Sequence, residues 1–184
     1  MTWNNDENLL KILKNKGVVV MPTDTIYGVL GRAEDRDTVE RIYQIRKRSP
    51  EKACIILIGD LEELKKFNIF LSEAEQKQIE KYTEPTSFIL DCADEKFAYL
   101  HRGTKTLAFR LPHPEELRNL LKETGPLIAP SANIEDGLPA QNITEAKKYF
   151  GNLVDLYVDG GAIARPASKI VRLHKDDSVS ILRE

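Results

Sequence analysis

The chain has 184 residues, of which 41% are hydrophobic and 30% are charged, and its 27 Lys and Arg against 29 Asp and Glu leave a formal net charge of −2. These values predict one globular domain over residues 1–184 and disfavour disorder, a collagen-like repeat and a disulfide scaffold. The first ten residues lack a leader pattern and no apolar run reaches the roughly 18 residues that cross a bilayer, so we expect a cytoplasmic protein without membrane contact.

Runs rich in Val and Ile alternate with segments of helical period in the first half of the chain, which is the pattern of an α/β domain. The first helix carries apolar residues over 9–13 and ends at Gly17. The expected elements that follow are a strand at 18–21, a helix at 37–48, a strand at 53–58, helices at 61–67 and 72–82, and strands at 87–92 and 106–111. Cys54 and Cys92 fall in two of these strands, where reduced cysteines behave as small buried apolar residues.

The second half continues the same alternation. Pro114 suits the first turn of a helix, and Gly125 ends that helix. The remaining expected elements are a strand at 127–129, a helix at 144–150, and strands at 156–158, 170–173 and 179–182. Because several strands end directly in loops rich in Thr, Ser, Asn and Gly, we expect one mixed β-sheet flanked by helices, with the functional residues in those loops.

The first candidate for a binding loop is PTDTIYG, residues 22–28, which follows the first strand. Hydroxyl side chains such as that of Thr23 bind polar ligands when they lie at the end of a buried strand. A Ser/Thr-type turn with a structural glycine explains the same residues. Composition leaves both interpretations open.

A second candidate is the basic segment Arg46-Lys47-Arg48, which is followed by Lys52. Residues 46 and 48 do not share a helix face, so a joint role requires the helix to end here, as Ser49-Pro50 suggests. Three cations converging in the turn would suit a triphosphate. A solvated basic helix terminus that complements the helix dipole is the alternative.

Polar residues at or after later strands form the third group. Ser131 and Asn133 carry a hydroxyl and an amide that can bind phosphate or sugar oxygens, although a turn explains them equally well. Thr106 and Arg110 share one face of a strand at period two. Arg110 interrupts an apolar strand, so we expect it to pair with an internal carboxylate or with an anionic ligand. Ser168 and Arg183 lie in or beside late polar segments.

Several familiar chemistries have no sequence signal. The chain contains no GxxxxGK[ST] phosphate loop and no GxSxG nucleophile turn. His101, His113 and His174 stand far apart and lack metal-ligand spacing with the cysteines. A structural zinc site and nucleophilic serine catalysis are therefore not expected.

Taken together, the motifs PTDTIYG, IYQIRKRSPEKACIILI, TLAFRLPHP, GPLIAPSANIEDGLPA, DGG and SKIV resemble the YrdC-like family of L-threonylcarbamoyladenylate synthases along nearly the whole chain. The resemblance implies a twisted mixed α/β sheet flanked by helices, with a concave basic cleft. It also implies that L-threonine, bicarbonate and ATP give threonylcarbamoyl-AMP and pyrophosphate. A partner transferase complex would use this product to modify tRNA.

The resemblance also implies which residues bind each substrate. For ATP these are Arg46, Arg48, Lys52, Thr106, Ser131, Asn133 and Arg183, and for threonine they are Thr23, Arg110, Ala129 through its backbone, and Ser168. Mg²⁺ would arrive on the phosphate oxygens of ATP rather than on protein ligands. No side chain serves as a covalent catalyst, because orientation and charge stabilisation suffice for the transfer.

The chain departs from the family's pattern at three places. Arg46 replaces the usual lysine of the basic segment, Glu84 begins a segment that is normally Gly-Pro-x-Thr, and Lys169 follows Ser168 where the family has Pro-Ser-Thr. The chain ends at Glu184, so we expect the short form without the C-terminal domain of longer members.

Two alternatives to the synthase share the same motifs. A noncatalytic relative would hold RNA on the concave face, and a sensor would bind ATP or threonine without turnover. Arg48 and the Ser131 loop favour the enzyme, because an RNA-binding protein does not need them. The slightly negative net charge points the same way, since nonspecific RNA binding draws on phosphate neutralisation.

Overall fold

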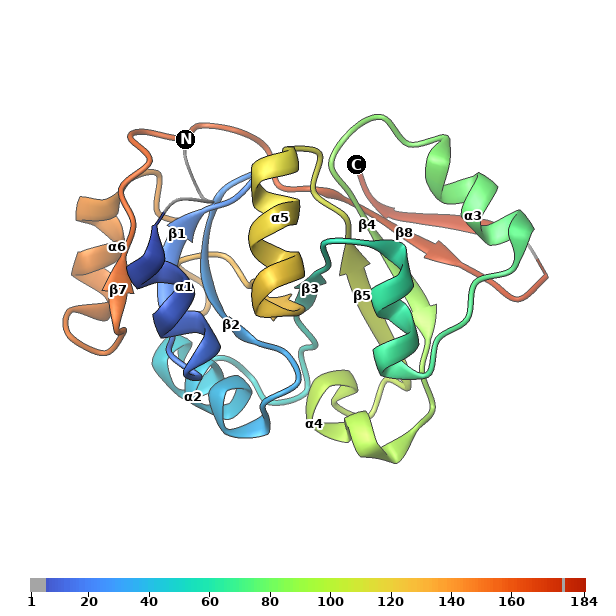
Figure 1. Ribbon diagram of the computed structural model, residues 1–184, viewed down its shortest axis with the longest axis horizontal. Coiled ribbons are helices and arrows are strands. Elements are labelled where there is room, and N and C mark those ends of the chain that lie inside the picture. The colour runs from blue at the N-terminus through green and yellow to red at the C-terminus, as the bar shows by residue number, and fades with distance from the viewer. Residues whose placement is uncertain (1–5, 177) are drawn as a thin grey trace.

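The structure is a computed structural model that describes residues 6–176 and 178–184. Residues 1–5, half of the ten-residue start in which the sequence shows no leader pattern, lie outside the described residues. No helix among the described residues has both the length and the apolar character to span a bilayer. Within the described residues, nine strands form one mixed sheet in the order β7-β1-β2-β6-β3-β5-β4-β8-β9, with helices packed against it (Figure 1).

Most elements agree with the sequence prediction to within about two residues. The strands are β1 (Val19–Pro22), β2 (Tyr27–Arg32), β3 (Ile55–Leu57), β4 (Thr86–Asp91), β5 (Thr106–Arg110), β6 (Leu127–Ile128), β7 (Leu156–Tyr157), β8 (Lys169–Leu173) and β9 (Val179–Arg183). The helices are α1 (Glu7–Lys14), α2 (Arg36–Arg46), α3 (Glu73–Glu80), α4 (Ala98–His101), α5 (Glu115–Thr124) and α6 (Ile143–Phe150), with 3₁₀ turns η1 (Leu61–Phe67) and η2 (Glu95–Phe97). Cys54 and Cys92 are free and buried, as expected.

Strand β2 is the main element that the sequence prediction missed. It pairs antiparallel with β1 on one side and with β6 on the other. Residues 27–31 are all buried, so the strand lacks the alternation of apolar and polar residues that identifies a half-exposed strand. Its two glycines also make it resemble a continued loop, and the same prediction missed the short helix α4.

The core occupies both faces of the sheet. Helices α1 and α5 lie side by side over one face (Figure 1), where Leu9, Leu13 and Leu120 are fully buried against the strands. The opposite face is covered by a larger cluster that includes Val39 and Ile42 of α2. Burying a leucine contributes roughly 1.5–3 kcal/mol, so these two layers fix the strand ends from which the functional loops leave.

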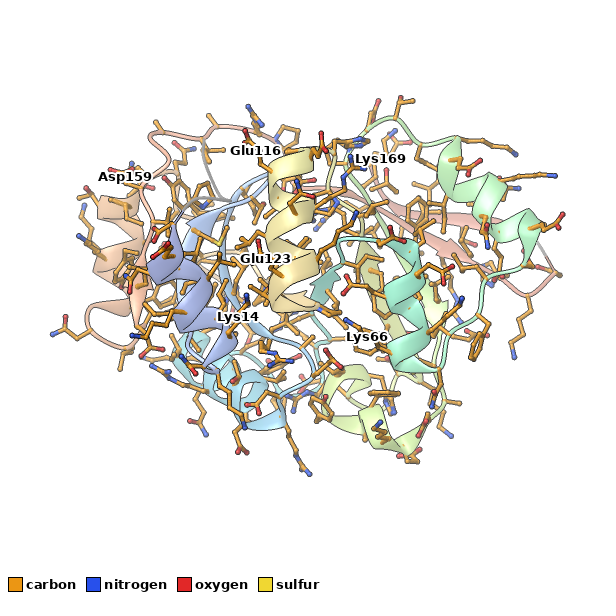
Figure 2. All side chains as sticks on the ribbon, viewed as in Figure 1. Lys14, Lys66, Glu116, Glu123, Asp159 and Lys169 are labelled. Atoms are coloured by element: carbon orange, nitrogen blue, oxygen red, sulfur yellow. The ribbon has the colours of Figure 1, made fainter. Side chains whose placement is uncertain are left out.

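An ion pair at the surface links the two helices of the first layer. Lys14 of α1 and Glu123 of α5 approach to 3.2 Å, and both are labelled in Figure 2. Their side chains are about half exposed, so we expect the pair to contribute no more than about 1 kcal/mol.

Candidate functional site

A cavity of about 290 Å³ collects residues from segments far apart in the sequence. Thr23, Arg48, Arg110, Ala129, Ser131, Ser168 and Arg183 all line it, and each was proposed from the sequence. The further lining residues are Thr25, Ile26, Gly28, Ala53, Cys54, Ile55, Pro130, Pro139, Ala167 and Ile170. The cavity therefore combines hydroxyl and guanidinium groups with an apolar wall.

Two of the candidate loops are joined directly through their backbones. Gly28 and Ser131 form an isolated β-bridge, and the amide of Val29 donates to the carbonyl of Pro130 at 2.9 Å. A Cβ atom on Gly28 would lie 3.3 Å from that carbonyl oxygen and 3.0 Å from Leu30 Cδ1, so glycine permits this close approach. The loop with Thr23 and the loop with Ser131 consequently face the cavity together.

Thr23 lies in a tight turn and also lines the cavity. Its hydroxyl donates to the carbonyl of Ile26 at 2.7 Å and accepts from the amide of Thr25 at 3.2 Å. The two threonine hydroxyls are 3.1 Å apart. The geometry thus satisfies both interpretations of this loop, because a Ser/Thr-type turn holds its hydroxyls at the cavity wall.

Arg110 forms a buried ion pair with Asp24. Its Nη2 atom lies 3.0 Å from Asp24 Oδ1, and the two side chains are only 4% and 3% exposed. Burial lowers the pKa of Arg110, although the nearby carboxylate partly offsets this effect. Within the described part of the chain, Arg110 Nε and Asp24 Oδ2 have no hydrogen-bond partner. The expected internal carboxylate is therefore present, and the same guanidinium group lines the cavity.

Arg48 is the member of the basic segment that lines the cavity. Helix α2 ends at Arg46, two residues before the expected end at residue 48, and Lys47 follows in the left-handed region with φ of 51°. Arg48 Nε donates to the carbonyl of Lys52 at 3.0 Å, and Nη2 donates to that of Ala53 at 2.9 Å. These bonds hold the guanidinium group in place before any ligand binds.

Arg46 does not join Arg48 in the cavity. Its side chain is buried, and its Nε donates to the carbonyl of Asn133 at 2.9 Å. Its Nη2 lies 3.3 Å from Ser131 Oγ and 3.2 Å from Asn133 Oδ1. Burial, and then repulsion by Arg48, lowers the pKa of Arg46 to about 10, so it remains charged at neutral pH. The predicted convergence of three cations is therefore wrong, because Arg46 supports the loop that carries Ser131.

The cavity lining also does not include Asn133, Lys52 or Thr106. Asn133 donates through Nδ2 to the carbonyls of Ile134 and Gly137, so its amide closes its own loop. Lys52 pairs with Glu135. Thr106 begins β5 and contacts Thr104, at the opposite end of the strand from Arg110 and roughly 13 Å away at 3.3 Å per residue. The ATP contacts assigned to these residues stay predictions.

Ser168 and Arg183 form a second polar group on the cavity wall. Arg183 donates to the carbonyl of Ser168 from Nε at 3.0 Å and from Nη2 at 2.7 Å. The hydroxyl of Ser168 lies 2.9 Å from that of Ser87, which is fully buried. Two of the residues at which the chain departs from the family's pattern, Glu84 and Lys169, lie beside this group. Their charges offset each other, because they form an ion pair at 3.1 Å.

Four polar residues of this region were missed by sequence reasoning. They are Asp24, Thr25, Ser87 and Glu135. Asp24 had a usable signal, because a buried arginine requires a counter-ion and Asp24 stands inside the recognised motif. Glu135 had none, since an acidic residue in a polar loop usually faces solvent.

Replacing Arg46 by methionine is expected to lower the free energy of unfolding by about 1–3 kcal/mol, because the buried oxygens of Asn133 lose their donors. Urea denaturation measures this change. Lys47→Met, on the exposed neighbour, serves as the control and should change stability little. If Arg46→Met is instead as stable as the wild-type protein but has lost affinity for ATP, Arg46 binds the phosphates.

The lining suits binding and orientation of a polyanion beside a small polar molecule. Three guanidinium groups, from Arg48, Arg110 and Arg183, offset negative charge, while hydroxyls of Thr23 and Ser131 supply hydrogen bonds. Among the described residues, no group of three or more His, Cys, Asp or Glu lies close enough together to hold a metal ion.

The comparisons with known proteins agree with this architecture. The family model Sua5_yciO_yrdC, described as telomere recombination, matches residues 11–184. The threonylcarbamoyl-AMP synthase of Bacillus subtilis is 30% identical over 94% of this chain and 51% of its own length. The enzyme of the same name from Halorhodospira halophila is 26% identical over 84% of this chain and 83% of its own.

Two solved structures share the fold. P. abyssi Sua5 complexed with L-threonine has a TM-score of 0.84 and 24% identity, covering 95% of this chain and 52% of its own. E. coli YciO has a TM-score of 0.81 and 25% identity, covering 96% and 87%. The chain thus spans about half the length of the B. subtilis and P. abyssi proteins. The predicted fold, a twisted mixed sheet flanked by helices, is confirmed, and the chain belongs to the Sua5/YciO/YrdC family.

Proposed function

We propose that the chain is a threonylcarbamoyl-AMP synthase, which forms threonylcarbamoyl-AMP and pyrophosphate from L-threonine, bicarbonate and ATP. The observation that carries the proposal is the single cavity in which Arg110 and Thr23 lie with Arg48, Ser131 and Arg183. Relatives that cover most of this chain carry the same enzyme name. Those relatives support catalysis over a purely RNA-binding or sensing role.

Threonine binds at the Arg110 side of the cavity. The guanidinium group of Arg110 offsets the substrate carboxylate, and the hydroxyl of Thr23 and the backbone at Ala129 lie on the same lining. The fold neighbour P. abyssi Sua5 was solved with L-threonine, which supports an amino-acid site in this architecture. Ser168, held by Ser87, borders this site.

The nucleotide binds toward Arg48, Ser131 and Arg183. The cavity lining contains no carboxylate among the described residues, so Mg²⁺ enters as the ATP complex, held by phosphate oxygens and water. Guanidinium groups offset the remaining negative charge. The lining is chemically suited to a metal–triphosphate complex.

The reaction requires little covalent chemistry from the protein. The threonine amine combines with bicarbonate and releases water, or combines with carbon dioxide and releases a proton, to give a carbamate. A carbamate oxygen then attacks the α-phosphorus of ATP. The bond to the β-phosphate bridging oxygen breaks, and pyrophosphate leaves with that electron pair. Arg48 and Arg183 stabilise negative charge that develops on the phosphates, and the loops hold the reactants in contact.

The product carries a reactive mixed anhydride, so a second protein must consume it promptly. A cytoplasmic transferase complex that modifies tRNA fits this chemistry, and contact with RNA near the cavity mouth would assist the transfer. The name shared by the curated relatives, threonylcarbamoyl-AMP synthase, supports this mixed anhydride as the product.

The proposal predicts pyrophosphate release that depends on threonine when purified protein is incubated with ATP, Mg²⁺, bicarbonate and L-threonine. Serine should react more slowly, because loss of one methyl contact is worth about 1–3 kcal/mol. A coupled pyrophosphate assay measures both rates. Release no greater than in a control without threonine would refute the synthase assignment.

A further inference from the structure

Glu135 joins the two loops that the nucleotide would contact. One carboxylate oxygen accepts from the amide of Ser49 at 2.5 Å and from its hydroxyl at 2.8 Å. The other oxygen pairs with the Lys52 ammonium group. The amide of Glu135 donates in turn to the carbonyl of Arg46 at 2.9 Å. One residue therefore binds the basic segment at three positions.

The electrostatics show that Glu135 remains ionised. Hydrogen bonds from Lys52 and then from Ser49 lower the pKa of Glu135 to about 2, well below the ordinary value for a glutamate. The carboxylate is thus charged throughout the physiological pH range, and its side chain is only 15% exposed. Its charge is directed to the Ser49–Lys52 turn.

The Ser49–Lys52 turn also holds the side chain of Arg48. The carbonyl of Lys52 accepts from Arg48 Nε at 3.0 Å and from the hydroxyl of Tyr43 at 2.7 Å. A displacement of Lys52 would therefore move the guanidinium group that lines the cavity. On the other side, Glu135 lies two residues after Asn133, whose loop carries Ser131.

We propose that Glu135 is a positioning residue that locks the Ser49–Lys52 turn against the Ser131 loop, so that Arg48 and Ser131 face the nucleotide together. The inference rests on the proposed function for its nucleotide. It also assigns a role to Lys52, which acts as the partner of Glu135 rather than as a phosphate ligand. The lock belongs to the ATP side, whereas Arg110 and Thr23 are held by separate bonds.

The first test measures ATP affinity. Isothermal titration with Mg²⁺ and a nonhydrolysable ATP analogue should give a dissociation constant about tenfold higher for Glu135→Gln than for wild type, because misplaced contacts weaken binding. In a separate measurement of steady-state kinetics, the KM of Glu135→Gln for threonine should differ from that of wild type by less than about twofold. Glu123→Gln, in the exposed Lys14 pair, is the matched control and should behave as wild type.

The second test measures the contact between Glu135 and the Ser49–Lys52 turn without a nucleotide. Hydrogen exchange of the Ser49 amide should be at least about tenfold faster in Glu135→Ala, because that amide loses its acceptor. Unchanged exchange, or an analogue affinity equal to that of wild type, would overturn the inference, as would equal losses for ATP and threonine. If the wild-type protein binds no ATP analogue, the proposed function is contradicted. Faster exchange of the Ser49 amide in Glu135→Ala would in that case still show that Glu135 holds the Ser49–Lys52 turn.

Discussion

Arg48→Ala is expected to lower kcat/KM for pyrophosphate formation by about a hundredfold or more, the effect of removing one charge-stabilising donor from a transfer site. Arg48 lines the cavity, and two backbone carbonyls fix its guanidinium group in advance. The substitution removes this charge without leaving a buried counter-charge unpaired. Steady-state pyrophosphate kinetics at varied ATP measure the loss, and the stability of the variant should stay close to that of wild type.

Two further variants test the explanation. Arg48→Lys keeps the charge but not the pair of anchoring bonds, so its rate should fall between those of wild type and Arg48→Ala. Lys47→Ala, on the exposed neighbour, should change the rate little. Near-normal kinetics for Arg48→Ala would place the triphosphate elsewhere.

Arg110→Met is expected to lower the free energy of unfolding by about 3–5 kcal/mol, because it leaves the carboxylate of Asp24 buried without its counter-ion. Urea denaturation measures this loss. In the fraction that remains folded, the KM for threonine should rise while ATP binding changes less, since Arg110 carries the charge that faces the substrate carboxylate.

The double variant Asp24→Asn with Arg110→Met separates folding from binding. Replacing both members of a buried pair removes the unpaired charge, so much of the lost stability should return. The threonine defect should persist, because the guanidinium group is still absent. Equal stability of the single and double variants would contradict the role of Asp24, and restored threonine use would contradict that of Arg110.

The sequence predicted the fold well where its physical signals are local. Helix α5 begins after Pro114 and ends before its C-cap Gly125, and α3 begins after its N-cap Ser72 with a capping box, so their limits lie close to the expected ones. Strand β2 was missed because it is buried on both faces. The order of the strands had no sequence signal, since pairing such as that of β3 with β6 depends on distant contacts.

The candidate site was predicted in part. Residues that follow strands or interrupt them, such as Arg110 and Ser131, do reach the cavity, because their polarity in an apolar context is visible in the sequence. The direction in which a side chain next to a helix end points is not visible in the sequence. Arg46 and Arg48 are two residues apart, yet the left-handed Lys47 directs one into the protein and the other to the cavity.

The most direct test of the synthase proposal follows the carbon of bicarbonate into the product. The protein is incubated with ¹³C-bicarbonate, L-threonine, ATP and Mg²⁺, and the nucleotides are analysed at once by mass spectrometry. We predict a nucleotide with the mass of AMP joined to a threonylcarbamoyl group that carries one ¹³C, and its loss in Arg48→Ala. Pyrophosphate release without this labelled nucleotide, or no reaction of ATP with threonine and bicarbonate, would contradict the proposal.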